Sequence, residues 1–456
     1  MSTVEELIER SRAAQQKFEF ATQEQVDAAA KAICKSIYDN AERLGKLAVV
    51  DSRMGKVEDK ISKCRAKSSL IWEDLKDKKS VGIVGKDEAK RLYKVAKPMG
   101  VVASIIPSTN PVVTPMSNAA FALKTRNSII FAPHPRGIQC CHECVKLFRE
   151  ALKGLGFPED LVLEVDEVSM ENSNKLMQLA DVIVATGGMG MVKAAYSSGK
   201  PAYGVGQGNV QCIVDSDADI QKAAADIVLG RGFDYGLICL GEQTAYIPAA
   251  KFEEFLEAFR AAGTYYVDDP KEVDIVRKGL FPEAGGPISR KIVGLSPAKI
   301  AEIIGLPGVP EDARVLAVRG TKPGRGDDLN REKMCPVINI IPYEGSFEDA
   351  VNMALINLDY EGKGHSVAVH SNTPEHVEYA ALHCPVSRLI VNQPAGTTGG
   401  GSPTNGFTAT TTLGCGSWGN NSFSGNFTYK LLMNLTRVGY PLDQSYLPDP
   451  AKAWED

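Results

Sequence analysis

Features that would direct this chain to membranes or nucleic acids are missing from its sequence. It holds no run of about 18 apolar residues, the length that a membrane-spanning helix needs. Its net charge is −5, so it lacks the basic excess with which proteins bind nucleic acid or an anionic membrane surface. The first twenty residues are charged and periodic, unlike a secretory signal peptide. We therefore expect a cytoplasmic protein without nucleic-acid or membrane partners.

A second pair of cysteines with metal-ligand spacing is also missing. The ten cysteines are scattered, and in a chain of 456 residues without a signal peptide we expect them to stay reduced. One cluster, Cys140, Cys141, His142 and Cys144, contains a CxxC spacing. A structural zinc site needs a second such pair, which the sequence does not contain. The cluster fits one face of an amphipathic helix better than a metal or redox site, and no metal is expected.

The chain does contain a regular alternation of strand and helix patterns. Its composition is 44% hydrophobic and 23% charged, as in ordinary globular proteins, and its length suits two or three domains. Helical spacing of apolar residues over 3–47 predicts two helices. From residue 101 on, short strands alternate with helices, which predicts βαβ units and mainly parallel sheets. The predicted fold class is therefore α/β.

The pattern divides the chain into several parts. Residues 1–79 and 101–231 are expected to form a Rossmann-type dinucleotide-binding domain, because buried strands there end in Gly, Thr or Asn. Residues 80–100 have the pattern of a β-hairpin around a charged turn. Residues 232–395 form a second α/β domain. Residues 396–456 begin with a Gly/Ser/Thr-rich loop, which is long enough to be functional or to lie at an interface.

Two glycine clusters follow predicted strands. The first, ATGGMGMVKAAYSSG (185–199), reads as strand, tight turn and helix, and the start of such a helix offers free N–H groups to an anion. It is not a GxGxxG motif. The second, GVGQGN (204–209), is explained better by a tight turn between two elements when it is taken by itself. Residue types alone therefore indicate a nucleotide site without establishing one.

Cys239 stands out among the cysteines because small residues surround it. It lies in RGFDYGLICLGEQTAYIP (231–248), at the predicted boundary between the two domains, where ligand clefts form. A free cysteine is more often a buried, inert residue than a nucleophile. Both interpretations stay open on these residues alone.

Longer stretches of the sequence resemble the aldehyde dehydrogenase superfamily, and within it the CoA-acylating branch, especially the acylating succinate-semialdehyde dehydrogenases. These stretches run in family order through nearly the whole chain: DSRMGKVEDK (51–60), KPMGVVASIIPSTNPVVTPM (97–116), KTRNSIIFAPHPR (124–136), ATGGMGMVKAAYSSGKPAYGVGQGN (185–209), FDYGLICLGEQ (233–243), REKMCPV (331–337), EGKGH (361–365) and TTTLGCGSWGNNS (410–422). The resemblance implies an aldehyde dehydrogenase-like fold with an oligomerisation hairpin at 80–100.

The resemblance also implies roles for individual residues. Cys239 matches the nucleophile, and Asn110 matches the amide that stabilises the oxyanion together with the Cys239 backbone N–H. Glu332 matches the carboxylate that binds the nicotinamide ribose. His365 matches a histidine proposed to assist the CoA thiol, although it could equally be a polar loop residue. The remaining cofactor-binding positions are Pro107, Ser108, Thr186, Gly187, Gly188 and Gly206.

One absence bears directly on the reaction. Hydrolytic members of the superfamily carry a glutamate base just before the second glycine cluster, and Val205 stands there in this chain. Water needs that base, whereas a CoA thiol is more acidic and intrinsically more nucleophilic. The resemblance and Val205 together predict a CoA-acylating enzyme that converts an aldehyde, CoA and NAD(P) reversibly into acyl-CoA and NAD(P)H. A hydrolytic aldehyde dehydrogenase is the alternative.

The substrate, the cofactor and the assembly are less constrained. Succinate semialdehyde is the best match, with sulfoacetaldehyde, acetaldehyde and propionaldehyde as alternatives. The family's usual Asn after FD is Tyr235 here, and Gly425 replaces an acidic residue, which favours an anionic substrate; Arg388 is a conceivable anion partner. Ala132 stands near the position of a phosphate-reading lysine in relatives, which favours NAD over NADP. The hairpin and the C-terminal segment imply a homodimer or homotetramer.

Overall fold

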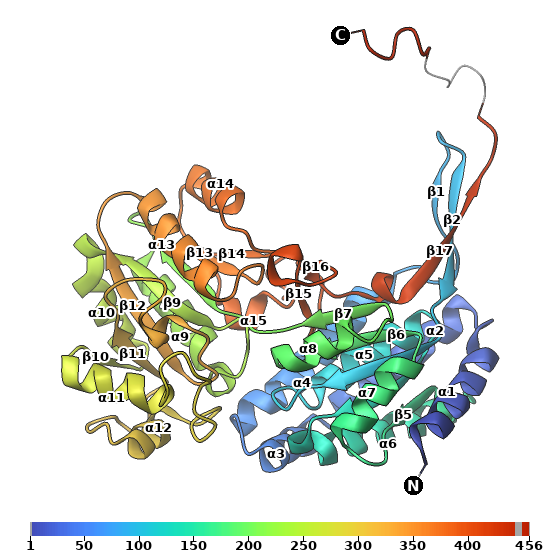
Figure 1. The fold of residues 1–456 in the computed structure, drawn as a ribbon, viewed down its shortest axis with the longest axis horizontal. Helices are drawn as coiled ribbons and strands as arrows, with labels where there is room; N and C mark the ends of the chain where they lie inside the picture. Colours follow the sequence, from blue (N-terminus) through green and yellow to red (C-terminus); the bar gives the residue numbers. More distant parts are fainter. Residues whose placement is uncertain (1, 443–448, 456) are drawn as a thin grey trace.

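Two α/β bodies and one projecting arm make up the part of the chain that the structure describes, residues 2–442 and 449–455 (Figure 1). This structure is a computed structural model. One body contains a five-stranded sheet and the other a seven-stranded sheet, and every strand pair in both sheets is parallel. The predicted α/β class with mainly parallel sheets is therefore confirmed.

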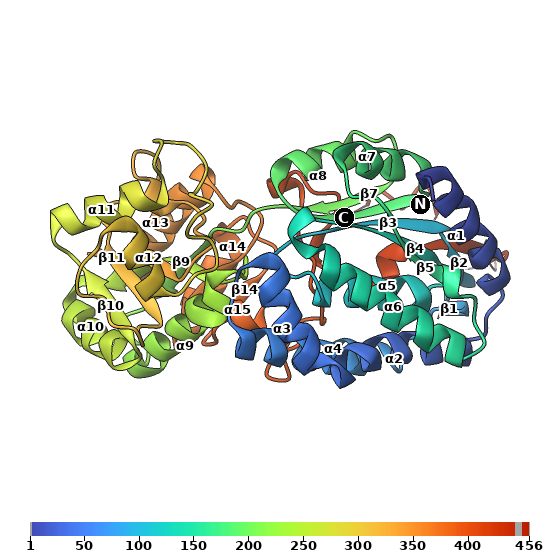
Figure 2. The same ribbon diagram turned by 90° about the horizontal axis from the view of Figure 1, so that it is seen from below.

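The first body is a sheet covered by helices on both faces. Its strands, in the order β5-β4-β3-β6-β7, are β3 (Val101–Ile106), β4 (Ser128–Pro133), β5 (Val162–Glu164), β6 (Val182–Thr186) and β7 (Ala202–Val205). Its helices are α1 (Val4–Phe18), α2 (Gln23–Asp39), α3 (Ala41–Ser52), α4 (Val57–Leu75), α5 (Val113–Lys124), α6 (Ile138–Gly154), α7 (Met170–Leu179) and α8 (Met189–Tyr196). Side chains of a strand alternate between the two faces, so Val101 and Ala103 pack with α1 and α7, whereas Val102 packs with α2 to α6. Figure 2 shows these layers on either side of the sheet.

The N-terminal segment holds more helices than its sequence pattern indicates. Instead of two helices over 3–47, the chain forms α1, α2 and α3, and α3 continues to Ser52. The break between α2 and α3 falls at Asn40, whose backbone (φ −103°, ψ 12°) departs from the helix. No glycine or proline marks this break, so the sequence pattern runs through it without interruption.

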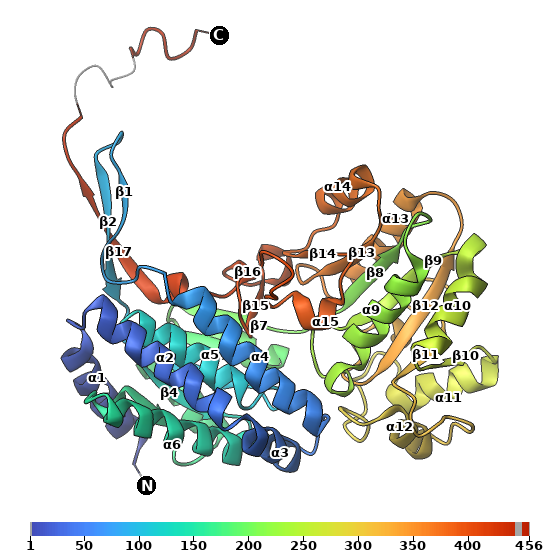
Figure 3. The same cartoon turned by 180° about the vertical axis from the view of Figure 1, so that it is seen from behind.

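The second body is a seven-stranded sheet. Its order is β10-β11-β12-β9-β8-β13-β14, formed by β8 (Val210–Val214), β9 (Glu242–Pro248), β10 (Thr264–Val267), β11 (Val315–Arg319), β12 (Val337–Tyr343), β13 (Val367–His370) and β14 (Leu389–Val391). Its helices are α9 (Ile220–Gly232), α10 (Phe252–Ala261), α11 (Pro270–Leu280), α12 (Pro297–Ile304), α13 (Phe347–Tyr360), α14 (Pro374–His383) and α15 (Ala395–Thr398). Figure 3 shows α9 and α10 against this sheet from behind.

The boundary between the bodies differs from the expected one at residue 231. Strand β8 lies between β9 and β13 in the seven-stranded sheet, so β8 and α9 belong to the second body. The chain therefore crosses between the bodies after Val205, within 206–209. All five residues of β8 are buried, and a short buried apolar run does not reveal which sheet it joins.

The arm is a three-stranded antiparallel sheet that projects from the first body (Figure 1). The predicted hairpin is confirmed as β1 (Gly82–Asp87) and β2 (Leu92–Pro98). Strand β17 (Met433–Gly439) pairs with β2 along its whole length and so brings the C-terminal segment onto the hairpin. The last part of the predicted C-terminal contact region, 443–448 and 456, lies outside the described residues.

A second, smaller hairpin is found in the C-terminal part of the chain. This hairpin, β15 (Leu413–Cys415) with β16 (Ser424–Asn426), lies between the bodies next to the cavities described below. Within the described residues, none of the helices combines the length and the apolar character that crossing a bilayer requires.

Candidate active site

The candidate site lies between the two bodies, at the carboxyl ends of strands in the five-stranded sheet and the amino ends of strands in the seven-stranded sheet. In the first body, the carboxyl ends of β3 and β6 lead into 107–110 and 186–188, and the strand order reverses direction between these two neighbours. Open α/β sheets bind ligands at such a switch point. The second body contributes the residues just before its strands: Cys239 precedes β9, Glu332 precedes β12 and His365 precedes β13.

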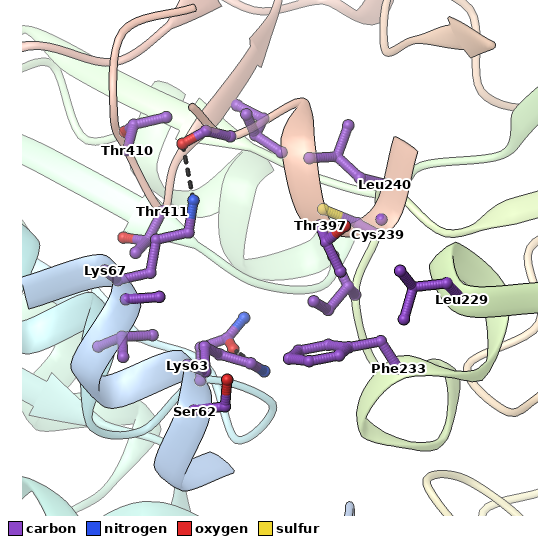
Figure 4. Close-up of a pocket in the computed structure, with 17 residues that line it drawn as sticks. Ser62, Lys63, Lys67, Leu229, Phe233, Cys239, Leu240, Thr397, Thr410 and Thr411 are labelled. Atoms are coloured by element: carbon purple, nitrogen blue, oxygen red, sulfur yellow. Dashed lines mark hydrogen bonds between the residues drawn. The ribbon is translucent and has the colours of Figure 1, made fainter. Parts of the chain in front are cut away.

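Two cavities meet at Cys239. The larger cavity, of about 480 Å³, is lined by every residue that the sequence predicts for catalysis or cofactor binding: Pro107, Ser108, Asn110, Thr186, Gly187, Gly188, Gly206, Cys239, Glu332 and His365. The smaller cavity, of about 280 Å³, is lined mostly by apolar side chains together with Lys63, Lys67 and three threonines (Figure 4). Asn110, Cys239, Thr411 and Leu413 line both cavities. A group bound in either cavity would therefore reach the Cys239 thiol.

A strained turn holds Cys239 in place. Asp234, Tyr235 and Gly236 all have left-handed backbones, with φ of 52°, 50° and 72°. Such conformations are uncommon for residues other than glycine and persist only where surrounding contacts fix them. The buried guanidinium of Arg231 supplies two of these contacts, donating to the carbonyls of Gly236 at 2.5 Å and Lys333 at 2.9 Å. Cys239 is partly exposed, and the nine other cysteines are buried.

Burial, and then the nearby Glu332 carboxyl, raises the pKa of the Cys239 thiol to about 12, while the charge of Arg388 opposes the rise. A thiolate is the reactive form of cysteine. Activation therefore requires a positive charge beside the sulfur or a base that takes its proton.

Lys63 determines the orientation of the Asn110 amide. The Lys63 ammonium donates to Asn110 Oδ1 at 2.9 Å. An ammonium has only donors, so it must meet the amide oxygen, and the amide NH₂ points away from it. Asn110 can therefore donate a hydrogen bond to an oxygen atom in the cavity that it shares with Cys239.

Glu332 is buried in the wall of the larger cavity. Its Oε1 accepts the Gly208 backbone N–H at 3.0 Å. Burial, together with the Glu361 carboxyl, raises its pKa to about 8, while the hydrogen bond from the Gly208 N–H opposes the rise. Only glycine fits at 208, because a Cβ there would lie 2.3 Å from the Cys239 carbonyl oxygen. Hydroxyl groups of a ribose could offer this carboxyl further hydrogen bonds.

His365 is a neutral imidazole inside the larger cavity. Within the described part of the chain, neither ring nitrogen has a hydrogen-bond partner, although the residue is buried. Burial, and then the charge of Arg388, lowers its pKa well below the ordinary value. A buried nitrogen without a partner is costly. A neutral ring of this kind can accept a proton from a thiol that enters the cavity.

The first body offers a dinucleotide a strand, a tight turn and a helix start. Strand β6 ends at Thr186, Gly187 and Gly188 form the turn, and α8 begins at Met189 with its first N–H groups unpaired within the helix. A Cβ added at Gly188 would enter open space, so a ligand can approach this backbone closely. These residues could hold a nicotinamide dinucleotide, because the start of α8 suits a phosphate and the Glu332 carboxyl suits ribose hydroxyls.

Some expected residues lie away from both cavities. The Arg388 guanidinium is buried and donates to Ser366 Oγ and to the carbonyls of His365 and Gly414, so these contacts, rather than a substrate anion, occupy it. Gly425 lies on β16 and, like Arg388, is not among the described residues that line either cavity. The predicted helix over the CHEC cluster is confirmed: Cys140, Cys141 and Cys144 are buried on α6.

Lys67 is a charged residue of the smaller cavity that the sequence analysis missed. It lies on α4 one turn after Lys63, in the wall of the smaller cavity, and its ammonium donates to the Gly400 carbonyl at 2.7 Å (Figure 4). The signal was available: Lys60, Lys63 and Lys67 recur at intervals of three and four residues, on one face of a helix. Such a stripe is normally a solvated face, whereas here it lies against the site.

A thiol shared by two cavities, beside a strand, tight turn and helix start that suit a phosphate, fits an oxidoreductase that acts on aldehydes. The comparisons with known proteins agree, because the model of the "Aldehyde dehydrogenase family" matches residues 1–276. The chain belongs to the aldehyde dehydrogenase family. It is 48% identical to the acetylating succinate-semialdehyde dehydrogenase of Clostridium kluyveri over 452 residues, which is 99% of each chain.

Two solved structures are similar along nearly the whole chain. One is an acetylating aldehyde dehydrogenase from Geobacillus thermoglucosidasius, with a TM-score of 0.93, 36% identity, and coverage of 98% of this chain and 97% of that one. The other is a propionaldehyde dehydrogenase from Rhodopseudomonas palustris with bound propionyl-CoA, with a TM-score of 0.86, 27% identity, and coverage of 96% and 94%. The predicted aldehyde dehydrogenase-like fold is thereby confirmed.

Proposed function

We propose that this chain is a CoA-acylating aldehyde dehydrogenase whose substrate is succinate semialdehyde, with succinyl-CoA as the product. The observation that carries the proposal is the position of Cys239, which lines both cavities. An aldehyde in the smaller cavity can form a bond to the sulfur while its carbonyl carbon faces the larger one. The similarity to the Clostridium kluyveri enzyme supports the substrate.

The residues of this chain support each stage of the reaction. Once the Cys239 thiol has given up its proton to solvent, its sulfur adds to the aldehyde carbon, and the Asn110 amide and the Cys239 backbone N–H donate to the oxygen as it becomes negative. Thr186, Gly187, Gly188 and Glu332 would hold the nicotinamide cofactor, which would supply the hydride acceptor for oxidation of this carbon and leave the substrate as a thioester of Cys239. A CoA thiol then attacks the thioester carbon, loses its proton to His365, and displaces the Cys239 sulfur.

Val205 supports CoA rather than water as the acceptor. It ends β7, is buried, and lines the larger cavity together with Cys239. Among the described residues that line this cavity, Glu332 is the one carboxyl group, and it accepts the Gly208 N–H. An apolar side chain at 205 cannot take a proton from water, whereas a thiol needs less help to react.

Lys67 supports an anionic substrate. The two lysines that line the smaller cavity differ in their partners: Lys63 pairs with Asp234 at 2.5 Å, whereas Lys67 has no carboxylate partner among the ion pairs of residues 2–442 and 449–455. Burial, and then the charge of Lys63, lowers the pKa of Lys67 to about 8. An ammonium without a counter-charge, in a mostly apolar cavity, is the receptor that the distal carboxylate of succinate semialdehyde requires.

Substitution of Lys67 is expected to remove the preference for an anionic aldehyde. For Lys67→Met, kcat/KM should fall about 100-fold with succinate semialdehyde, the scale of one charge-assisted hydrogen bond, and by less than about threefold with butanal. The measurement is initial NADH formation with both aldehydes and with sulfoacetaldehyde, using Lys67→Arg as the charge-retaining control. Equal losses with butanal would show that Lys67 does not read the carboxylate.

Titration of Lys67 is expected to make KM for the anionic aldehyde depend on pH. Its protonated form binds the anion, so in the free enzyme the charge is present below pH 8 and is lost as the pH rises through the pKa of about 8. KM for succinate semialdehyde should therefore increase above pH 8, while KM for butanal should not. A wild-type KM profile for each aldehyde from pH 6 to pH 9.5 measures this difference, and Lys67→Met should flatten the first profile.

We also infer NAD as the preferred cofactor, an assembly of two or four copies, and a cytoplasmic location. The preference for NAD is supported by Ala132, a small apolar residue in the buried strand β4.

The assembly of two or four copies is supported by the arm, because β1 and β17 are its edge strands and leave backbone groups free to pair with a second copy. A location in the reducing cytoplasm is supported by the ten cysteines, all free thiols. Light scattering on the purified protein, with and without residues 433–456, tests the assembly.

A further inference from the structure

Three buried charges connect the nucleophile turn to the Asn110 amide. Lys60 and Lys63, on α4, both contact Asp234 Oδ2, at 2.9 and 2.5 Å. All three side chains are at most 6% exposed. Lys60 also donates to the Thr109 carbonyl at 2.8 Å, directly before Asn110. The group joins α4, the loop after β3 and the turn before Cys239.

Lys63 is the member of this group that contacts both catalytic parts. Its ammonium donates to Asn110 Oδ1 and to Asp234 Oδ2, and it lies 5.9 Å above the ring of Phe233. Asp234 in turn accepts the Lys56 backbone N–H, and its own N–H donates to Asp59. Asp234 is the first of the left-handed residues that lead to Cys239.

We propose that Lys63 is a positioning residue for the oxyanion: it holds the Asn110 amide with its NH₂ towards the substrate oxygen, and it ties this amide to the Cys239 turn through Asp234. The inference rests on the proposed role of Asn110. Without Lys63 the amide can rotate, and a donor that is not fixed in advance stabilises a developing charge poorly. The Lys63 charge also polarises the amide and strengthens the hydrogen bond that its NH₂ donates.

The test is a double-mutant cycle on the acylation stage. Lys63→Met should lower the rate constant of the first NADH burst about 100-fold and leave KM for the aldehyde within about threefold. Combined with Asn110→Ala, it should add less than about threefold to the loss from Asn110→Ala alone, because both changes remove one interaction. Lys63→Arg should recover part of the rate. Arg65→Met, an exposed cation on the same helix, is the matched control and should match the wild type.

The outcomes separate this inference from a purely structural role and from the proposed function. If the two losses multiply, or if KM rises with the rate unchanged, Lys63 does not act through Asn110 and the inference fails. If Asn110→Ala itself keeps the wild-type burst, the assigned role of Asn110 fails instead. Should Lys63→Met fold poorly because Asp234 loses a partner, the variant Lys63→Met/Asp234→Asn removes that charge, and the same non-additivity with Asn110→Ala is expected.

Discussion

Replacing Cys239 with alanine is expected to lower kcat by about 10⁴-fold or more, because the nucleophile that carries the acyl group is removed. The Cys239 side chain is small, and its turn is held by hydrogen bonds from the Arg231 guanidinium to backbone carbonyls, so the fold should persist. The dissociation constant for NADH should stay near that of the wild type, since Cys239 contributes one atom to a cavity that many residues line. Steady-state NADH formation and NADH fluorescence titration measure the two quantities.

A second thiol provides the control for Cys239. Cys384 is buried at the end of α14 and is outside both cavities as the described residues define them. Cys384→Ala should keep nearly full activity, with some loss of stability from the missing sulfur. Retained turnover in Cys239→Ala, or an equal loss in both variants, would contradict the assignment of the nucleophile.

Replacing Asn110 is expected to have the next largest effect. Asn110→Ala should lower kcat about 10²- to 10³-fold, the loss that follows removal of one oxyanion donor. Asn110→Asp should lose more, because the carboxylate keeps the Lys63 contact but offers no N–H and places a negative charge beside the forming oxyanion. Single-turnover NADH formation measures this stage directly.

Two checks accompany the Asn110 variants. KM for NAD should change little, because the amide is assigned to the aldehyde oxygen. Asn172→Ala, on α7 and away from both cavities as described, should behave like the wild type. If Asn110→Asp were as active as the wild type, a donor at this position would not be needed.

Local patterns predicted most of the strands and helices. The helix that carries Cys140, Cys141 and Cys144 and the arm hairpin were predicted from apolar spacing and turn residues, which are local signals. The membership of β8 depended on pairing with β9 and β13, from more distant parts of the chain, and no local signal reports such pairing. The break at Asn40 carried only a weak signal, because asparagine often ends a helix but interrupts the pattern less clearly than glycine or proline.

The candidate site divides in the same way. Cys239 alone could be an inert thiol or a nucleophile, and only the resemblance of the surrounding stretches decided between them. The ten catalytic and cofactor-binding positions that the resemblance implied all line the larger cavity. The spacing of Lys60, Lys63 and Lys67 places them on one helix face but does not show which way that face is turned, and such a face normally points to solvent. Only the packing of α4 against the Cys239 turn shows that this face is turned inwards.

The most direct test of the central claim is the fate of the thioester in the presence and absence of CoA. Purified protein is mixed rapidly with NAD and succinate semialdehyde, NADH is followed by absorbance, and the products are identified by mass spectrometry. Without CoA we expect a burst of about one NADH per active site and then little turnover; with CoA we expect sustained turnover with succinyl-CoA equal to the NADH formed. Sustained turnover without CoA, with free succinate as the product, would show that water is the acceptor and would contradict the proposed function.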